Sequence, residues 1–142
     1  ANTLIHTFDV QFAIWAPIYI GEAAWVATQL FASDEVTSAL LPQVTAPFIA
    51  ANIFQSLWCA SFRASYGEGW TKYISAAMLA GTATSLGLVH SAGAAVAISN
   101  STILTQLLLP LTMHFGWTSA ATLVNLNGSL ASDKNASTKS LA

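Results

Sequence analysis

Long apolar stretches, separated by short polar segments, dominate the chain. No Asp, Glu, Lys or Arg occurs from Val36 to Phe62 or from Tyr73 to Ser132. A helix that crosses a membrane needs roughly 20 mostly apolar residues. The two charge-free stretches have room for three such helices, and the apolar region before them has room for another. The pattern therefore predicts four transmembrane helices, at about residues 10–31, 45–62, 73–98 and 103–126.

The predicted fold class is all-α, as a polytopic bundle of about four transmembrane spans within residues 1–126. Polar connectors separate the predicted helices, and Glu35 belongs to the connector that closes the first one. After Asn125 the composition shifts to Asn, Ser, Lys and Ala. Chain ends of this kind are ordered only where something ties them down. Residues 127–142 are therefore expected to form a mobile, polar tail.

Composition supports the membrane interpretation. The chain is 54% hydrophobic and only 7% charged, whereas soluble domains carry roughly 25% charged residues. The alternative is a very apolar soluble helical bundle. The chain has no basic patch, so nucleic acid is not an expected partner. The expected partners are membrane lipids and other membrane protein subunits.

The few charges are distributed unevenly about the predicted spans. Four spans place the connector at 63–72 and the tail on one side, and Asp34 and Glu35 on the other. The first side receives every basic residue: Arg63, Lys72, Lys134 and Lys139. By the positive-inside rule, both termini are expected on the cytoplasmic or stromal-equivalent side of the membrane.

Prolines and small residues predict local features of the helices. Pro17 and Pro110 fall inside predicted spans, where each is expected to kink its helix. Pro47 falls near the expected start of the second span, where proline is well tolerated. Ala77 and Gly81 begin a run of small residues at every fourth position of the third span. Such spacing lets helix backbones approach closely.

Glu22 is the first candidate for chemistry, because it falls near the middle of the first span. An ionisable group there costs several kcal/mol by insertion scales and is by default a functional candidate. Helical spacing places it on one stripe with Trp15 and Tyr19. The alternative is a structural residue, either protonated or hydrogen-bonded to Asn52 or Gln55 of the second span. A proton or transport pathway through Glu22 is a lesser hypothesis.

The second candidate is His114, in the fourth span, with His90 of the third span as a weaker one. A neutral imidazole inside a membrane can hydrogen-bond, bind a metal or ligate a chlorophyll or haem, and the alternative is an ordinary buried histidine. The histidines lie far apart in sequence without a metal-site spacing, so no protein-only metal site is predicted. His114, His90 and Glu22 remain candidate ligands of a pigment magnesium. The motifs of the common enzyme classes are absent from the sequence, and the chain is not expected to be an enzyme.

Three tryptophans, Trp15, Trp58 and Trp117, fall deep within predicted spans. Buried aromatic side chains usually pack against one another, but they can also wall a pocket for a flat apolar ligand. The sequence alone leaves both interpretations open for these residues.

The segments around these tryptophans resemble the tryptophan-rich sensory protein and translocator protein (TspO-like) family. The stretch from Pro110 to Asn125, PLTMHFGWTSAATLVN, resembles the last helix of the family. Residues 12–19, FAIWAPIY, resemble its second helix, and Gln55 to Trp58 resemble part of another. The usual first helix of the family is not recognisable, which leaves four expected spans instead of five. Gln55 also replaces a common Asn, and His114 stands where Tyr is common.

The resemblance implies a protein that binds porphyrins or other apolar ligands in an aromatic-lined pocket, without an established enzymatic role. Carried over to this chain, it implies pocket or helix-contact roles for five residues: Trp15, Tyr19, Trp58, Trp117 and Asn125. The leading hypothesis is therefore a non-enzymatic membrane protein that binds an apolar or tetrapyrrole-type ligand. Glu22, Asn52, Gln55 and His114 would supply the polar contacts to that ligand.

The main rival is an accessory structural subunit of a larger membrane complex. Little of the chain lies outside the predicted spans, and a bundle without one family helix would leave a groove for a neighbour. A photosynthetic pigment–protein supercomplex, a photosystem or antenna in a thylakoid membrane, is the favoured version. The reason is chemical: buried His, Asn, Gln and Glu side chains can all ligate chlorophyll magnesium.

Overall fold

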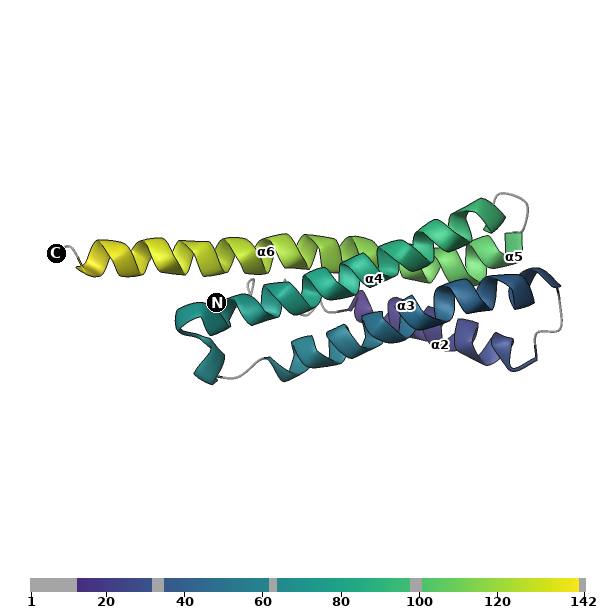
Figure 1. The fold of residues 1–142 in the computed structure, drawn as a ribbon, viewed down its shortest axis with the longest axis horizontal. Helices are drawn as coiled ribbons and strands as arrows, with labels where there is room; N and C mark the ends of the chain where they lie inside the picture. The colour runs from purple at the N-terminus through teal and green to yellow at the C-terminus, as the bar shows by residue number, and fades with distance from the viewer. Residues whose placement is uncertain (1–12, 32–34, 62–63, 98–100, 141–142) are drawn as a thin grey trace.

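The computed structural model describes residues 13–31, 35–61, 64–97 and 101–140, and this part of the chain is almost entirely helical, without a strand (Figure 1). The long helices are α2 (Trp15–Gln29), α3 (Glu35–Ala60), α4 (Ile74–Ala97) and α6 (Leu109–Ser140). Short elements connect them: the 3₁₀-helices η1 (Ala64–Tyr66) and η2 (Gly69–Tyr73), the single turn α5 (Ser101–Ile103), and the π-helix η3 (Leu104–Leu108). The all-α prediction is confirmed.

Among the described residues, two helical stretches are long and apolar enough to cross a membrane, α3 and the stretch Leu104–Asp133. This judgement rests on length and composition. The 15 residues of α2 fall short of the roughly 20 that a span needs, and the predicted span extends upstream into residues outside the described part. The count of four spans stays a prediction.

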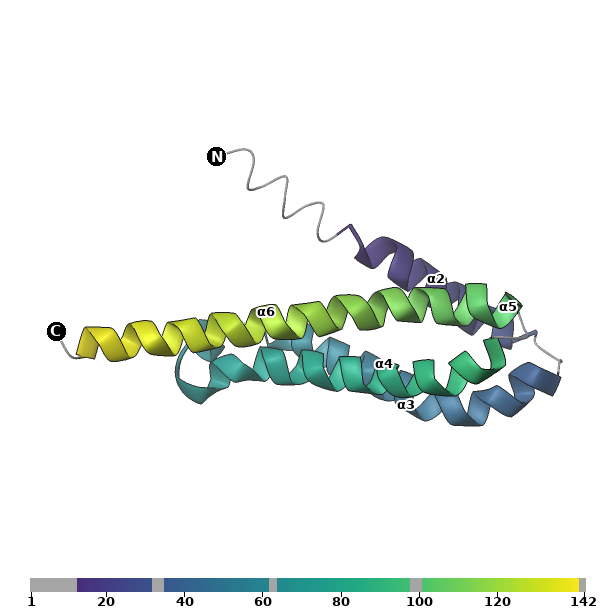
Figure 2. The ribbon, with the colours of Figure 1, turned by 90° about the horizontal axis from the view of Figure 1, so that it is seen from above.

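The helices pack in the order α3, α4, α6, α2. Helix α4 lies between α3 and α6, while α2 packs on α6 and on η3 but makes few contacts with α3. Figure 2 shows α2 on one side of α6, with α3 and α4 on the other. The bundle is consequently closed along three helix pairs and open between α2 and α3.

Apolar side chains of α3, α4, η3 and the start of α6 fill most of the core, and Trp25 of α2 joins them. Leu86, Val89, Leu107 and Leu111 are at most 1% exposed. The close packing predicted for the third span is found at Gly81, where an added β-carbon would lie 2.8 Å from the ring of Phe54 on α3. Glycine there lets α3 and α4 approach each other closely.

The second long helix begins earlier than the sequence suggested. It starts at Glu35 instead of near residue 45, so Glu35 opens α3 and does not close the preceding helix. A carboxylate in the first turn is favourable at the positive end of the helix dipole. Pro47, expected near a helix start, lies inside α3 together with Pro42. That expectation was wrong, because the helix extends upstream through both prolines.

The two prolines that were expected to kink helices have different surroundings. Pro17 falls in the first turn of α2, where a missing N–H removes no intrahelical bond. Pro110 is the second residue of α6 and follows the π-helix η3 directly. Proline cannot donate to the preceding turn, and a π-helical turn is one of the ways a helix accommodates such a break.

The last helix continues beyond its predicted end near residue 126 and stays helical to Ser140. The predicted polar tail is thus helical over most of its length, while its mobility stays a prediction. Side-chain contacts tie this extension to the connector between α3 and α4, as described below. The connector and the extension therefore lie at the same end of the molecule, while the side of the membrane that they face stays a prediction.

Candidate functional site

The centre of the candidate site is a buried pair formed by Glu22 of α2 and His114 of α6. Nδ1 of His114 lies 2.7 Å from Oε1 of Glu22. Glu22 is 5% exposed and His114 is 0% exposed. Buried ionisable groups are tolerated in apolar surroundings only when they are paired and hydrogen-bonded. The sequence alternative, a bond from Glu22 to Asn52 or Gln55, named the wrong partner.

A close contact between the backbone of α2 and the ring of Pro110 on α6 lies beside this pair. A β-carbon added at Gly21 would lie 2.5 Å from Cγ of Pro110. Glu22 follows Gly21 directly, and His114 follows Pro110 by one helical turn. The Gly21–Pro110 contact thus brings the two helices close enough for a glutamate and a histidine to meet.

Aromatic side chains surround the imidazole. Trp15 is at their centre, and its ring centroid lies 5.3 Å from that of Tyr19, 6.0 Å from that of Trp58 and 6.2 Å from that of Trp117. The His114 ring meets Trp15 edge-on at 5.5 Å and Tyr19 at 6.1 Å. Edge-to-face arrangements of this kind are favourable beyond the apolar area that they bury. Four of the five residues implied by the family resemblance therefore meet at Trp15, and two of them, Trp15 and Tyr19, contact His114.

Two polar side chains beside this cluster keep unsatisfied atoms. Within the described residues, Nε2 of His114 and both polar atoms of the Gln55 amide are buried without a hydrogen-bond partner. Tyr19 comes close to both: its ring contacts His114, and its hydroxyl lies near the Gln55 amide without the geometry of a hydrogen bond. Buried polar groups without a partner are uncommon, and each calls for an explanation such as a bound molecule.

A groove runs along the open side of the bundle, between α2 and α3, with a volume of about 850 Å³. Its walls are mostly apolar, with Val26 and Leu30 on α2 and Phe48 and Ile53 on α3. The polar residues on its walls are Tyr19, Glu22, Asn52 and Ser56. Glu22 belongs both to the buried pair and to the groove, so the two features form one site.

Asn52 and Gln55, which the sequence analysis offered together as polar contacts to a ligand, are separated in the structure. Gln55 points inward and is 5% exposed, Asn52 is half-buried on the groove wall, and Cys59 is exposed. Residues three positions apart on a helix differ in direction by a fraction of a turn. Because of that difference, the Gln55 amide is buried beside Tyr19, whereas the Asn52 amide lines the groove.

Asn125 lies apart from the His114 cluster and belongs to a hydrogen-bonded bridge across three helices. Nε1 of Trp58 donates to Oγ of Ser75 at 3.0 Å, and that hydroxyl donates to Oδ1 of Asn125 at 2.8 Å. Asn125 donates in turn to the carbonyl of Ala121. Trp58 thus joins the aromatic cluster to a bridge that holds α3, α4 and α6 together, and Asn125 is a helix-contact residue.

The candidate pigment ligands are placed differently. Among the described residues, no three His, Cys, Asp or Glu side chains gather as a metal site would require. His90 is half-buried on α4 and takes no part in the cluster. The imidazole of His114 is fully buried, so its Nε2 does not reach the groove. Of the three candidates, Glu22 alone lines the groove.

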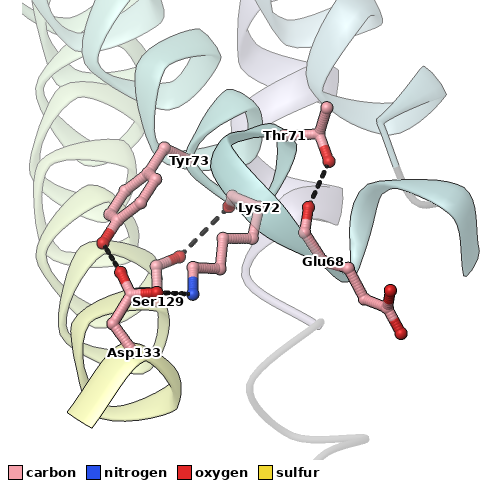
Figure 3. Close-up of polar contacts among 6 residues, drawn as sticks. All are labelled: Glu68, Thr71, Lys72, Tyr73, Ser129 and Asp133. Carbon is pink, nitrogen blue, oxygen red and sulfur yellow. Dashed lines mark hydrogen bonds and ion pairs between the residues drawn. The ribbon is translucent and has the colours of Figure 1, made fainter. Parts of the chain in front are cut away.

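A second polar cluster joins the connector to the extension of α6 (Figure 3). Asp133 forms an ion pair with Lys72 and accepts a hydrogen bond from the hydroxyl of Tyr73. Ser129 donates to the backbone carbonyl of Lys72 at 3.1 Å. The hydrogen bond to Asp133, followed by desolvation, raises the pKa of Tyr73 above its ordinary value of 10.0, so the phenol remains a donor at physiological pH. This cluster is a structural tie at the end of the bundle.

Sequence reasoning missed three of these features: the Gly21–Pro110 contact, the Ser75 bridge and the Asp133 cluster. A serine in an apolar helix and an aspartate in a polar tail look ordinary in a sequence. Their partners lie 17 to 61 residues away along the chain, so no local pattern indicates the contacts.

Comparison with known families gives the chain its affiliation. No curated protein and no solved structure matches it. The sequence profile of the TSPO-like proteins matches residues 1–138, which is nearly the whole chain, and the resemblance inferred from the tryptophan segments is thereby confirmed. The chain belongs to the TSPO-like protein family and is a membrane protein of the TspO type.

Proposed function

We propose that this chain is a non-enzymatic membrane protein that binds a flat, apolar ligand of the tetrapyrrole type in the groove between α2 and α3. The observation that carries the proposal is the position of Glu22. This residue is nearly fully buried, held by His114 from one side, and still part of the groove wall. Intramembrane ionisable residues are rare and mark functional sites by default.

The shape and lining of the groove support the same proposal. Small-molecule sites are mostly apolar concavities of about 300–1,000 Å³ with a few placed polar groups, and a groove of about 850 Å³ falls within that range. The rings of Tyr19 and Phe48 stand on opposite walls, where a flat ligand would contact both. Tyr19 is also a neighbour of His114 and Gln55, whose buried polar atoms have no hydrogen-bond partner among the described residues.

The chain's own residues would hold such a ligand in a defined way. Apolar side chains of α2 and α3 would bury its faces, and Glu22 and Asn52 would orient its polar edge. A bound metallotetrapyrrole would supply light absorption or redox chemistry. Direct ligation of its metal by His114 does not fit, because Nε2 is enclosed within the bundle. The role of His114 would be to fix the Glu22 carboxyl.

A pair of neighbouring alanines on α2 offers a matched test. Ala27 lines the groove, whereas Ala24 is exposed elsewhere on the same helix. In lipid nanodiscs, octaethylporphyrin is expected to bind the unchanged protein and Ala24→Phe alike, measured by tryptophan quenching and porphyrin absorbance. Ala27→Phe would fill part of the groove and is expected to weaken binding at least about tenfold, roughly 1.4 kcal/mol. Equal binding by both variants would contradict the proposal.

A second candidate function is that of an accessory subunit in a larger membrane complex. The open edge between α2 and α3 favours it, because helices in membranes associate by packing and hydrogen bonding along such edges. The photosynthetic version, in a thylakoid membrane, adds a chlorophyll whose magnesium would meet the Glu22 carboxyl. Native-gel separation of gently solubilised source membranes tests both forms. Migration in a large coloured complex supports the pigment version, and a small colourless band contradicts both.

A further inference from the structure

The hydrogen bonds of the Glu22 carboxyl are asymmetric. Oε1 is engaged by Nδ1 of His114. No described residue provides a hydrogen bond to Oε2, which is also not sealed within the protein. Because Glu22 lines the groove, Oε2 is the carboxyl oxygen left available to a molecule bound there. This oxygen has lone pairs in every protonation state of the Glu22–His114 pair.

The neighbouring polar groups on the α3 wall add further acceptor capacity. The Nδ2 group of Asn52 donates to the carbonyl of Phe48, so Oδ1 remains for the groove. The hydroxyl of Ser56 donates its proton to the carbonyl of Asn52, so only its lone pairs remain. Asn52 and Ser56 are one helical turn apart and both line the groove. A carboxyl oxygen is the strongest acceptor among these groups.

We propose that the ligand of this groove carries an O–H or N–H donor at its polar end, seated on Oε2 of Glu22, and that ligands ending in a carboxylate are rejected. This inference rests on the proposed function, since it concerns the same groove. A donor satisfies a nearly buried acceptor that would otherwise have no partner. A carboxylate at the same place has no hydrogen to donate, so two acceptors would face each other and both would stay unsatisfied.

Lipid acyl chains are a poor occupant of the groove for the same reason. They offer no hydrogen-bond donor, and a polar group facing hydrocarbon without a partner is costly. A site built to hydrogen-bond its ligand discriminates strongly against an analogue without the matching group. The chemistry of the polar end is therefore expected to decide affinity in this groove.

Three probes with one apolar body and different ends test the inference: retinol, retinal and retinoic acid. Retinol ends in a donor, retinal in an acceptor and retinoic acid in a carboxylate. Binding would be measured by tryptophan quenching in nanodiscs at slightly alkaline pH, with empty nanodiscs subtracted to remove partition into lipid. Retinol is expected to bind at least about tenfold tighter than either of the others.

Two variants examine the part played by Glu22. Glu22→Gln replaces the carboxyl with an amide, whose NH2 group can donate to a carboxylate, and is expected to narrow the preference for retinol over retinoic acid. Glu35 is an exposed residue at the start of α3, outside the groove. Glu35→Gln is therefore expected to leave the preference for retinol over retinoic acid unchanged. The comparison of the three probes on the unchanged protein needs neither variant, so it remains decisive if Glu22→Gln fails to fold.

The outcomes separate this inference from the proposed function. Equal affinity for retinol and retinal, or tightest binding of retinoic acid, overturns the donor requirement and leaves the groove as a ligand site. Binding of retinol that Ala27→Phe does not weaken places the ligand elsewhere and overturns the donor site on Glu22. Failure of every probe and of octaethylporphyrin to bind overturns the proposed function and this inference together.

Discussion

Gly21 and Pro110 lie so close that a β-carbon on the glycine would come within 2.5 Å of Cγ of the proline. The contact joins α2 to the start of α6, next in sequence to Glu22 and one turn before His114. Glycine leaves room for the proline ring, and the ring fills the space that a side chain on α2 would otherwise occupy. The buried Glu22–His114 pair depends on this fit.

Substitution of Gly21 by Val should therefore separate α2 from α6. Overpacking of this kind costs about 1–3 kcal/mol, and thermal unfolding in detergent followed by circular dichroism would show it as a lower Tm. The matched control is Gly116→Ala on α6, where an added β-carbon meets nothing within 4 Å; alanine there should be neutral or slightly stabilising. A Gly21→Val protein as stable as this control would refute the role of the contact.

The Glu22–His114 pair should behave as a coupled unit. Glu22→Leu or His114→Leu alone leaves a buried partner unpaired and should destabilise the protein by about 3–5 kcal/mol. The double variant leaves no orphaned partner, so it should cost less than the sum of the two, by about 1–3 kcal/mol. Chemical unfolding of the four proteins completes the cycle. Additivity within about 0.5 kcal/mol would mean that the two side chains do not interact.

Ser75 should matter more than its size suggests. Ser75→Ala removes the hydroxyl between Trp58 and Asn125 and leaves an indole N–H and an amide oxygen without their partner. The expected cost is about 1–3 kcal/mol, measured by chemical unfolding. Ser91 is an exposed residue of the same helix, and its hydroxyl donates to the backbone carbonyl of Gly87, one turn earlier. Ser91→Ala should therefore change stability by less than about 0.5 kcal/mol. Equal effects of the two substitutions would rule out the bridge as a stabilising feature.

Asp133 should hold the extension of α6 in its helical form. Asp133→Asn weakens the ion pair with Lys72 and the bond from Tyr73, so amide hydrogen exchange beyond residue 126 should become faster. High salt should reduce the difference in exchange rate between the unchanged protein and Asp133→Asn, because exposed ion pairs are screened. Glu68→Gln, on the same connector and exposed, is the control and should leave the exchange unchanged. Unchanged exchange in Asp133→Asn would show that the extension is stable without the tie.

The sequence predicted the helical architecture well, because apolar stretches and the absence of charge are local signals. It predicted the ends of α3 and α6 poorly. Proline and polar residues usually end helices, but α3 continues through Pro42 and Pro47, and α6 is supported by contacts with the connector. The sequence also selected Glu22 and His114 as separate candidates. Their pairing joins residues 92 positions apart and depends on how α2 docks, which no periodicity reveals.

The division of Asn52 from Gln55 was beyond sequence reasoning for a related reason. Both amides fall on one side of α3, and the sequence analysis gave both the same role, as polar contacts to the ligand. Which of them faces the groove depends on where α2 leaves α3 uncovered, and that is a property of the whole bundle. The sequence did identify the four aromatic residues that meet: Trp15, Tyr19, Trp58 and Trp117. Aromatic residues deep in apolar helices usually pack against one another in the interior.

The central claim is that a ligand lies in the groove between α2 and α3, against Glu22. Methyl NMR of isoleucine-labelled protein in nanodiscs tests it most directly, because a porphyrin ring shifts the resonances of methyl groups near its faces. Ile49 and Ile53 line the groove, while Ile20 lies outside it and is more exposed than either. Addition of octaethylporphyrin should shift the Ile49 and Ile53 methyl signals and leave Ile20 unchanged. Shifts at Ile20 alone, or no shift at either groove residue, would contradict the account.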